Sequence, residues 1–468
     1  MVKQQSSWIP KFKRGSGPAY LLIASAIADD IAIGQLQPQQ RLPPQRKLAQ
    51  LLGLDFTTIA RAYREANQRG LVEAVVGRGT FVSGRRRARI PHIVEGRPNV
   101  DLSMNMPPEV ISTELSALMQ DGFARVGTNL GGLMRYQDFC GSTDDRLAGA
   151  MWLKRRGLAV EQENLLVMPG AQSALLVILT TIAGPGSIVC CEELTYPGLR
   201  ALAGQLGIRL IGLPMDAEGI DALAFATACS QYAPKALYCN PTLLNPTTLT
   251  ISGSRRQALV DVARNYDVAI IEDDAYGFLP KNSPPPIASL GPDITFYVSG
   301  LAKCLGAGLR VAYVVAPDQV SASRLALAVR TTTVMVSPIT AALATRWIRD
   351  GTADLALSAI RKESIARQRL VSKILPPGCF NATPDAFHLW VRLPPPWSGV
   401  AFADKMQQLG IGVVASAAFV VGIAAPAAVR VCLGGIASRE EVSAALAVIA
   451  DLLLNTSQKS KFANEQVY

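Results

Sequence analysis

Residues 297–317 read YVSGLAKCLGAGLRVAYVVAP, with a single lysine, Lys303, between an apolar run and a glycine-spaced turn that ends in Arg310. A lysine on a loop between apolar segments can lose its proton through desolvation, and the neutral amine can then form a Schiff base with an aldehyde. An arginine seven residues further on can bind a phosphate. The alternative is an ordinary surface lysine.

The quoted stretch belongs to a long region, beyond about Thr113, in which helical patterns alternate with short apolar runs. This alternation predicts an α/β layer architecture with a largely parallel sheet. Ligands bind such sheets just beyond the ends of the strands, where this chain places polar residues. The runs expected to form strands are 165–168, 187–190, 236–238, 268–271 and 295–298.

Three of these runs are followed by residues suited to a flat, phosphate-bearing ligand. Gly170-Ala171-Gln172 opens a helix whose free N–H groups can hold a phosphate, although such a turn is commonplace. Tyr196 can stack on a flat ring or belong to the core. Asn245 stands before a proline and is either a rigid amide donor or part of a turn.

Three consecutive carboxylates, Glu272, Asp273 and Asp274, follow the fourth run, and Tyr276 comes two residues later. Carboxylates at a strand end can bind a metal ion. The chain has only two histidines and no cluster of ligands near these residues, so we expect no metal site.

Taken in order, these strand-end residues resemble those of the fold-type-I aminotransferases, over roughly residues 136–437. The resemblance implies a large domain with a mainly parallel sheet, a smaller α+β domain and pyridoxal 5'-phosphate as cofactor. Lys303 would form the internal aldimine, and Asp273 would keep the pyridine nitrogen protonated. The other roles implied are hydrogen bonds to the ring hydroxyl from Asn245 and Tyr276, stacking by Tyr196, and phosphate binding by Gly170, Ala171, Gln172 and Arg310.

Two further roles are implied by the same resemblance. Tyr136, in RYQDFCGSTDDRLAGAMWLKRRG, is similar to the tyrosine that reaches the phosphate of the partner subunit, which implies a homodimer. Arg430, in AVRVCLGG, is similar to the arginine that grips a substrate carboxylate. The chain departs from many relatives at Gly300 and Ala302, where they have hydroxyl residues, and at Thr248, where they have glycine. The phosphate site is therefore expected to be weaker or differently built.

The amino-terminal part has a different pattern. Apolar residues at helical spacing predict a first helix that ends near Gly34, a short second helix beginning at Pro44, and a third from about Asp55 to Gly70. Two short strands, 71–76 and 80–82, are expected on either side of a basic turn. This order predicts a winged helix-turn-helix, whose third helix enters the major groove of DNA. A small helical dimerisation domain is the alternative.

The amino-acid sequence of this part resembles that of a known family. LQPQQRLPPQRKLAQLLGLDFTTIARAYREANQRGLVEAVVGRGTFV is similar to the GntR-type DNA-binding domain, and the resemblance covers residues 35–82. Phe56 stands where many members have an arginine that begins the recognition helix, so the chain departs from the family at that position. The resemblance implies DNA contacts from Arg46, Thr57, Thr58, Arg61, Arg78 and Thr80.

Composition sets the context for both parts. The formal net charge of +10 and a pI near 9.3 favour a polyanionic partner. Eight cysteines without CxxC pairs or metal-type spacing predict reduced thiols in the cytoplasm, and the amino terminus lacks the apolar core of a secretory signal. Residues 411–429 are uncharged and long enough to span a bilayer, but their many Ala and Gly residues favour buried core.

We therefore expect three parts: a winged helix-turn-helix at 17–84, a linker with an arginine-rich start at 85–112, and an aminotransferase-like domain that binds pyridoxal phosphate at 113–460. The combination resembles the MocR family of transcriptional regulators. The resemblance implies a regulator that binds double-stranded operator DNA and senses an amino acid or amine effector by aldimine exchange. Two alternatives stay open. One is an active aminotransferase whose amino-terminal DNA-binding domain is incidental to its activity, and the other is a regulator that senses pyridoxal phosphate itself.

Overall fold

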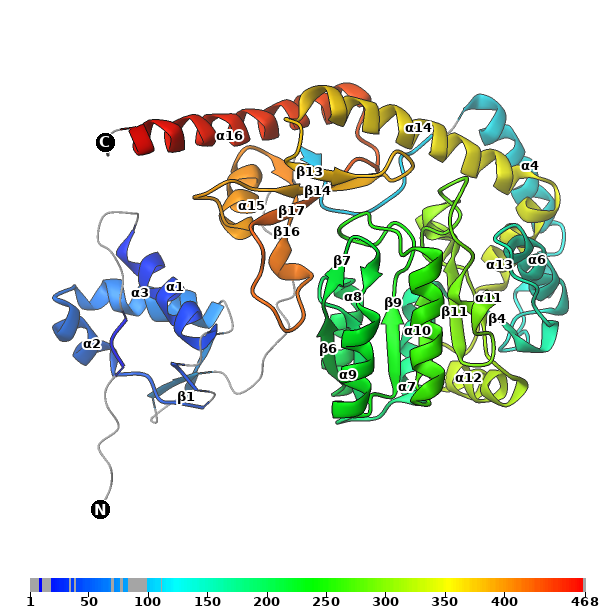
Figure 1. Cartoon of the computed structure of the whole chain (residues 1–468), viewed down its shortest axis with the longest axis horizontal. Helices are drawn as coiled ribbons and strands as arrows, with labels where there is room; N and C mark the ends of the chain where they lie inside the picture. The colour runs from blue at the N-terminus through cyan, green and yellow to red at the C-terminus, as the bar shows by residue number, and fades with distance from the viewer. Residues whose placement is uncertain are drawn as a thin grey trace, which may run out of the picture. The chain divides into compact units, whose positions relative to one another are not determined.

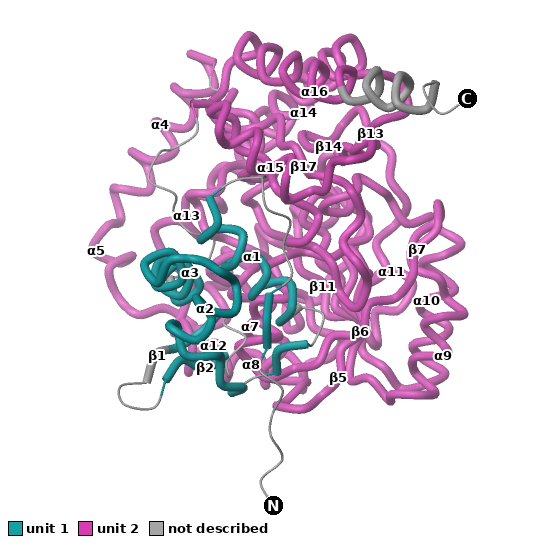
Figure 2. The backbone as a smooth tube through the Cα atoms, turned by 90° about the vertical axis from the view of Figure 1, so that its left-hand side faces the viewer, with its two compact units in different colours: residues 1–94 teal, residues 95–468 magenta. Residues whose placement is uncertain are grey.

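The computed structural model describes residues 8–10, 18–32, 35–37, 39–68, 71–75, 79–82, 99–110 and 112–465. The chain divides into two compact units, Met1–Val94 and Glu95–Tyr468, shown in teal and magenta in Figure 2. We call them the N-terminal and the C-terminal unit. The domain limits expected from the sequence, 17–84, 85–112 and 113–460, stay predictions.

The N-terminal unit is the expected winged helix-turn-helix. Its three helices enclose a small core in which Ile23, Ile27, Leu48 and Ile59 are fully buried. The second helix begins just after Pro44 and ends where Gly53 adopts a left-handed conformation (φ +62°), which glycine adopts without steric cost. The elements are α1 (Ala19–Ala32), α2 (Gln45–Leu52), α3 (Phe56–Gln68), and the antiparallel pair β1 (Val72–Val75) and β2 (Gly79–Val82).

The C-terminal unit contains a seven-stranded sheet, drawn in green and yellow-green in Figure 1. Every neighbouring pair is parallel except the two that involve β12, which runs antiparallel to β11 and β4. The expected α/β fold with a largely parallel sheet is confirmed. The strand order is β4 (Leu165–Met168), β12 (Ala312–Val315), β11 (Thr295–Gly300), β10 (Ala269–Asp273), β9 (Ala236–Cys239), β5 (Ile188–Glu192) and β6 (Arg209–Leu213).

Helices cover both faces of this sheet because alternate strand residues point to opposite sides and both sides are apolar. Leu166 and Met168 pack with the helices of one face, and Leu165 and Val167 pack with those of the other. The first face carries α7 (Ala171–Ile182), α8 (Pro197–Leu206) and α12 (Gln319–Thr332), and the second carries α6 (Thr143–Lys154), α9 (Ala222–Tyr232), α10 (Gly253–Asn265) and α13 (Pro338–Arg349).

The C-terminal unit also contains a smaller, four-stranded antiparallel sheet. Its strands are β13 (Phe380–Ala382), β14 (His388–Arg392), β17 (Ala428–Cys432) and β16 (Val414–Ala415). Its core packs against α14 (Thr352–Ile374), α15 (Gly399–Gln408) and α16 (Arg439–Glu465). Beside it, β3 (Val100–Asp101) pairs in parallel with β15 (Ile411–Gly412), so residues expected as part of the linker are built into this unit.

The remaining elements are short or lie at the surface. In the part of the chain that the structure describes, residues 411–429 form strands and turns, and no helix is long and apolar enough to span a membrane. All eight cysteines are described and none forms a disulfide. The remaining elements are α4 (Thr113–Gly127), α5 (Leu130–Leu133), α11 (Ile287–Leu290), β7 (Met215–Asp216), β8 (Gly219–Ile220), and the 3-10 turns η1 (Gln162–Asn164), η2 (Leu301–Lys303), η3 (Ala307–Leu309) and η4 (Ser416–Ala418).

Candidate functional site

Most of the predicted site residues gather at one edge of the large sheet, where its parallel strands end. Since β12 runs antiparallel, the residues that precede it lie at this same edge. Gly170 follows β4, Tyr196 follows β5, Asn245 follows β9, Asp273 ends β10, Lys303 follows β11 within η2, and Arg310 precedes β12.

Lys303 is half-buried at this edge. Its ammonium donates a hydrogen bond to the backbone carbonyl of Asn105, and its Nζ lies 6.0 Å from the centre of the Tyr276 ring. Burial lowers the pKa of Lys303 to about 8, with help from the positive charge of Arg430 and against the negative charge of Asp273. About one tenth of the Lys303 side chains are therefore neutral amines at pH 7.

Asp273 presents a buried carboxylate to the site. Tyr238 donates its hydroxyl hydrogen to Oδ2 of Asp273 at 2.9 Å, whereas Oδ1 is buried and has no hydrogen-bond partner among the described residues. Burial raises the pKa of Asp273 to about 6, and the Tyr238 hydrogen bond opposes this rise. A buried acceptor without a partner is costly, so Oδ1 is suited to a donor supplied by a ligand.

The polar group that positions Asp273 and Asn245 is the side chain of Asn240. Its Nδ2 donates to the Asp273 carbonyl at 2.5 Å, and its Oδ1 accepts from the Asn245 N–H at 3.0 Å. The buried carboxylate of Glu192 in turn accepts the Asn240 N–H at 2.6 Å, and burial raises the pKa of Glu192 to about 7. Because these bonds join the ends of β5, β9 and β10, they fix the large-sheet side of the site.

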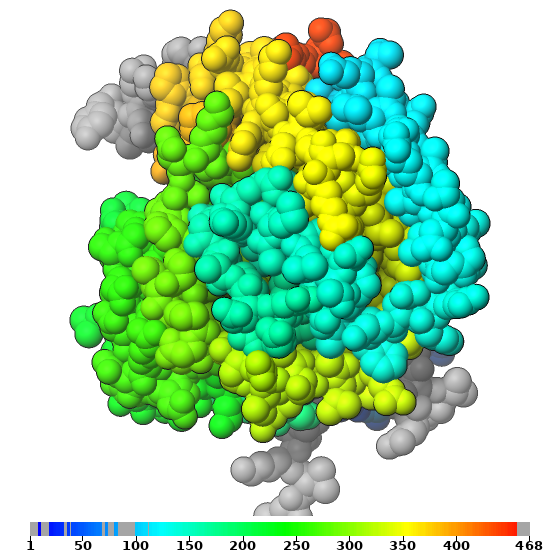
Figure 3. Space-filling model, turned by 90° about the vertical axis from the view of Figure 1, so that its right-hand side faces the viewer, coloured from blue at the N-terminus to red at the C-terminus, as the bar shows by residue number. Residues whose placement is uncertain are grey.

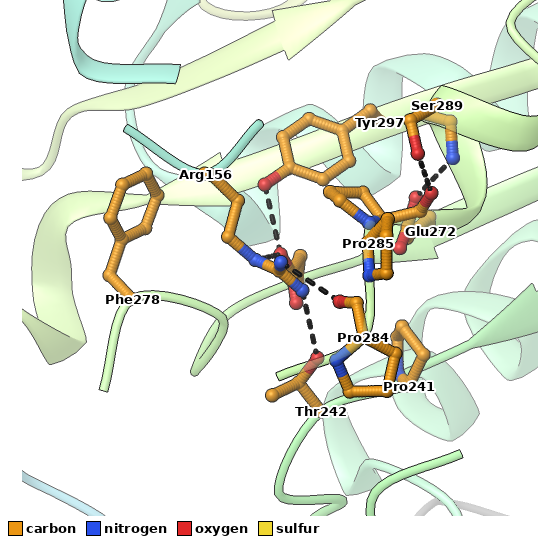
Figure 4. Close-up of polar contacts among 12 residues, drawn as sticks. Arg156, Pro241, Thr242, Glu272, Phe278, Pro284, Pro285, Ser289 and Tyr297 are labelled. Carbon is orange, nitrogen blue, oxygen red and sulfur yellow. Dashed lines mark hydrogen bonds and ion pairs between the residues drawn. The ribbon is translucent and has the colours of Figure 1, made fainter. Parts of the chain in front are cut away.

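The carboxylates on either side of Asp273 are held by other groups. Arg156 bonds Asp274 at 2.9 Å through Nε. Figure 4 shows that the same side chain also reaches the Thr242 hydroxyl and the Pro284 carbonyl. Glu272 accepts the two N–H groups that begin α11, each at 2.8 Å. Since neighbouring strand residues point to opposite faces, only Asp273 is turned toward Lys303. Among the described residues, no group of three histidines, cysteines or carboxylates is arranged to hold a metal ion.

The candidate anion-binding end of the site lies at the start of α7. Gly170 has a left-handed backbone (φ +88°), and a Cβ placed on it would lie 3.0 Å from Nη2 of Arg310, so the guanidinium packs directly against this glycine. The Tyr196 hydroxyl donates to Oε1 of Gln172 at 3.1 Å. The structure thus brings Gly170, Ala171, Gln172, Tyr196 and Arg310 together beside free helix N–H groups.

Arg430 enters the site from β17 of the small sheet. Its Nη1 donates to Oδ1 of Asn245 at 3.0 Å, its Nη2 donates to the Ser103 carbonyl, and its guanidinium lies 5.2 Å from the Phe419 ring centre. Nε of Arg430 is buried without a partner among the described residues. Burial lowers the pKa of Arg430, yet the group stays charged because an arginine pKa begins so high.

Sequence reasoning missed Ser103 and Asn105, because both fall in the segment expected to be a linker. The Asn105 side chain donates to the Tyr276 hydroxyl at 2.8 Å, its carbonyl accepts from Lys303, and its Oδ1 is buried without a partner in the described chain. The sequence SMNMPP shows no local sign of this role. Tyr238 was also missed, because inside an apolar strand it reads as core.

Tyr136 differs from the other predicted residues. It follows α5 and its side chain is 82% exposed. It takes part in none of the hydrogen bonds that join the other site residues. The resemblance assigned it to the partner subunit, and this exposure is compatible with such a role.

The DNA-binding candidates lie on the N-terminal unit, and the exposed ones are Arg46, Thr57 and Arg61. Arg61 stacks on the Tyr20 ring at 4.4 Å and Arg46 lies 5.9 Å from the Phe56 ring centre, so Phe56 supports a basic side chain. Thr58 and Thr80 are half-buried, and Arg78 lies outside the described residues. Sequence reasoning missed Arg41, whose guanidinium lies beside Gly79 at the start of β2.

The comparisons with known proteins agree with both units. Residues 99–449 match the family described as aminotransferase class I and II, and residues 19–82 match the bacterial regulatory proteins of the gntR family. The chain therefore belongs to the class I and II aminotransferase family, and it carries a GntR helix-turn-helix domain before that region. The MocR-like architecture expected from the sequence is confirmed.

Similar proteins share this arrangement. The HTH-type transcriptional regulator YdeF of Bacillus subtilis (strain 168) is 29% identical over 459 residues, which cover 96% of this chain and 97% of YdeF. YjiR of Escherichia coli (strain K12), also named an HTH-type transcriptional regulator, is 25% identical over 86% of this chain and 91% of its own length. The chain is an HTH-type transcriptional regulator with an aminotransferase-like domain.

Solved structures show the fold of the C-terminal unit. A kynurenine aminotransferase of Pyrococcus horikoshii matches with a TM-score of 0.70 and 21% identity, over 76% of this chain and 91% of its own. An archaeal alanine:glyoxylate aminotransferase matches with a TM-score of 0.69 and 24% identity, over 75% and 90%.

Proposed function

We propose that this regulator binds pyridoxal 5'-phosphate and uses its aminotransferase-like domain to sense an amino acid or amine effector. The observation that carries the proposal is the pairing of a buried, unpartnered carboxylate oxygen on Asp273 with a lysine whose pKa is lowered to about 8. A protonated ring nitrogen would supply the donor that Asp273 Oδ1 lacks, and the neutral Lys303 amine would attack an aldehyde. The donor set therefore fits this cofactor.

The other residues of the site fit the rest of the cofactor. Arg310 with the N–H groups of Ala171 and Gln172 would hold a phosphate beside Gly170, whose own N–H donates to the Met168 carbonyl at 2.7 Å. Tyr196 would cover the ring. Asn245 and Tyr276 would donate to the ring hydroxyl. When bound, the cofactor supplies an aldehyde and an electron-withdrawing ring, and the chain's own residues orient it. A related fold, the α-aminoadipate aminotransferase LysN of Thermus thermophilus, was solved with N-(5'-phosphopyridoxyl)-L-leucine.

Arg430 favours an effector that carries a carboxylate. Its unpartnered Nε and its Nη2 form one side of the guanidinium fork, the side suited to two parallel hydrogen bonds with a carboxylate. An effector that binds one arrangement of the protein more tightly than another shifts the population toward that arrangement. Such a difference in affinity would couple the site to DNA binding.

The test combines absorbance with DNA binding. Purified protein loaded with pyridoxal phosphate is titrated with each of the twenty L-amino acids, and duplexes selected from a random pool serve as operator. We expect an absorbance change and altered operator affinity with the same amino acid. A protein that binds operator identically with and without cofactor and every amino acid would refute the proposal.

An active aminotransferase is the second candidate, favoured by the lowered pKa of Lys303, which also suits a general base. We expect little keto acid over many turnovers, because a sensor that consumes its effector loses the signal. Sustained keto acid production on the order of one per second or faster would establish the enzyme instead. Operator affinity that changes with cofactor alone would favour a sensor of pyridoxal phosphate.

We further propose that the protein is a homodimer formed through the surface around α4 and α5. This surface exposes large apolar side chains: Phe123 is 59% exposed, Leu130 50%, Met134 71% and Tyr136 82%. Residues of this region, in cyan, run along one edge of the face seen in Figure 3. Exposed apolar side chains that gather in this way mark association surfaces. Light scattering should give twice the chain mass, and Met134→Glu should lower it while Leu223→Glu, at an exposed leucine elsewhere, should not.

A further inference from the structure

Phe56 is a large aromatic residue at the surface of the N-terminal unit. It is 45% exposed, and it belongs neither to the core of this unit nor to the apolar residues that pack against that core. It is also the first residue of α3, the helix expected to enter the major groove of DNA. In a helix-turn-helix, the first residues of that helix contact the edges of the bases. The ring therefore lies where the operator sequence is read.

The helix α3 buries one side and exposes a continuous strip on the other. Ile59, Tyr63 and Ala66 pack into the core. The exposed residues, which follow one another around the helix at 3.6 residues per turn, are Phe56, Thr57, Arg61, Arg64 and Asn67. Ala60 is half-buried one turn after Phe56, and its short side chain leaves room for a base edge beside the ring.

The two polar residues next to Phe56 bond to each other. Oδ1 of Asp55 accepts the Thr57 N–H at 2.7 Å and the hydrogen of the Thr57 hydroxyl at 2.5 Å. These bonds hold the pKa of the Asp55 carboxyl below its ordinary value, so the group is an ionised acceptor. Because the hydroxyl has only one hydrogen, neither neighbour of Phe56 has a side-chain hydrogen left to donate to a base. The first residues of α3 thus present a ring to the groove.

The surroundings of the ring are basic, which favours DNA as the molecule that covers it. The Arg46 guanidinium lies 5.9 Å from the ring centre, and Arg61 and Arg64 are exposed on the same helix. The net charge of +10 of the whole chain lies entirely within residues 1–94, since the charges of the remaining residues cancel. These cations would bind phosphates on either side of the groove. A second copy of this unit would repel the same face.

We propose that Phe56 recognises the C5 methyl group of a thymine in the major groove of the operator. Thymine is the only one of the four bases that presents a methyl group in this groove. Phe56 therefore determines sequence specificity by an apolar contact, at the place where an arginine would read guanine. The inference concerns DNA binding alone and is independent of the proposed cofactor and effector.

The other base edges suit the ring less well. Guanine and adenine present acceptors in the major groove, and adenine and cytosine present donors. A ring that covers such a group removes its water without giving it a hydrogen-bond partner, which costs free energy. Covering a methyl group removes apolar surface of both molecules from water. The loss of one thymine methyl should therefore weaken binding about fourfold.

Selection of duplexes from a random pool tests the assignment on the full-length protein, with and without pyridoxal phosphate. We expect the parent to select thymine at one position of each bound sequence. Phe56→Ala should lose that preference and keep the preferences at the other positions. Leu51→Ala, at a leucine of α2 that is 46% exposed, is the matched control and should select the thymine as the parent does. The same base preferences in the parent and in Phe56→Ala would overturn the proposal, as would a loss of preference at every position.

Single methyl groups make the test quantitative. Deoxyuridine in place of the selected thymidine removes only the methyl group, so it should lower the affinity of the parent about fourfold and leave that of Phe56→Ala unchanged. At the same position, 5-methylcytosine should bind the parent more tightly than cytosine by a similar factor. Anisotropy titrations measure these affinities. An equal loss with deoxyuridine in both proteins would show that the methyl group acts through the shape of the DNA, and the proposal would fall.

The variant Phe56→Arg gives an independent sign. A guanidinium pairs with the N7 and O6 acceptors of guanine, so this variant should select guanine where the parent selects thymine. Continued selection of thymine by Phe56→Arg would mean that another residue reads this base.

Discussion

The two sides of the candidate site are held in place by different kinds of contact. On the large-sheet side, Asp273 is fixed by the Tyr238 hydroxyl and by Asn240, which Glu192 supports, all within the buried ends of three strands. On the other side, Arg430 contacts the Ser103 carbonyl, and Lys303, which lies between the two sides, contacts the Asn105 carbonyl. The first set of contacts is buried among strand ends, whereas the second involves the charged groups that a carboxylate or an aldehyde would bind. The first side is therefore suited to hold a cofactor and the second to respond to an effector.

The largest expected effect comes from Lys303, which belongs to both sides. Lys303→Ala removes the only amine that these contacts place beside Asp273 and Tyr276, so the covalent link to pyridoxal phosphate should be lost completely. Borohydride reduction followed by peptide mapping measures the link. Lys281→Ala, at an exposed lysine of the same unit, should keep it. A label on any other lysine of the parent protein would refute the assignment of the cofactor.

The second prediction separates the two sides. Arg430→Ala should weaken the binding of amino acids about 100-fold, because two hydrogen bonds to a charged group are lost. The covalent link between Lys303 and the cofactor should stay intact, since Asp273 keeps its own partners. Arg430→Lys keeps the charge without the fork and should recover only part of the affinity. Loss of the covalent link in the Arg430→Ala protein would show that Arg430 is needed to hold the cofactor as well as the effector.

The third prediction concerns the DNA-binding unit, whose own contacts with DNA are made outside both sides of the site. Arg61→Ala should weaken operator binding about tenfold and reduce the salt dependence by about one counterion, because a phosphate contact releases counterions. Electrophoretic mobility or anisotropy titrations at several salt concentrations measure both quantities, and the cofactor spectrum serves as the control. Unchanged affinity and salt dependence would remove Arg61 from the recognition helix's DNA contacts.

The sequence predicted the large-sheet side of the site better than the other side. Apolar runs locate the strands, and a polar residue just after each run must lie at the common edge, so Gly170, Asp273 and Lys303 could be placed together without the structure. The strand expected at 165–168 matches β4 residue for residue. The order of residue types along the chain identified the chemistry of these site residues.

The segment 101–106 could not be predicted in the same way. Its contacts are made chiefly by backbone oxygens, which every residue carries, so the letters SMNM contain no sign of them. Asn105 is brought to Tyr276 from 171 positions away by the pairing of β3 with β15, two residues each. Tyr238 was missed for the opposite reason, since its apolar neighbours made it look like ordinary core. Leu51 and Leu52 show the limit of helical periodicity, because either could face the core and only Leu52 does.

The smallest predicted effect tests the electrostatic link between the two sides. The pKa of Lys303 is lowered to about 8, first by burial and then by the positive charge of Arg430. Only the neutral amine attacks an aldehyde, so the rate of cofactor attachment should rise about fivefold from pH 7 to pH 8 and level off above about pH 9. Stopped-flow absorbance at low pyridoxal phosphate measures this rate.

In Arg430→Ala the positive neighbour is gone, so the pKa of Lys303 rises and the whole pH profile of the attachment rate should move to higher pH. Arg330→Ala, at an exposed arginine on α12, should leave the profile in place. A rate that does not vary between pH 7 and pH 9 would mean that Lys303 is already neutral or is not the attacking group, and the proposed coupling between the two sides would lose its basis.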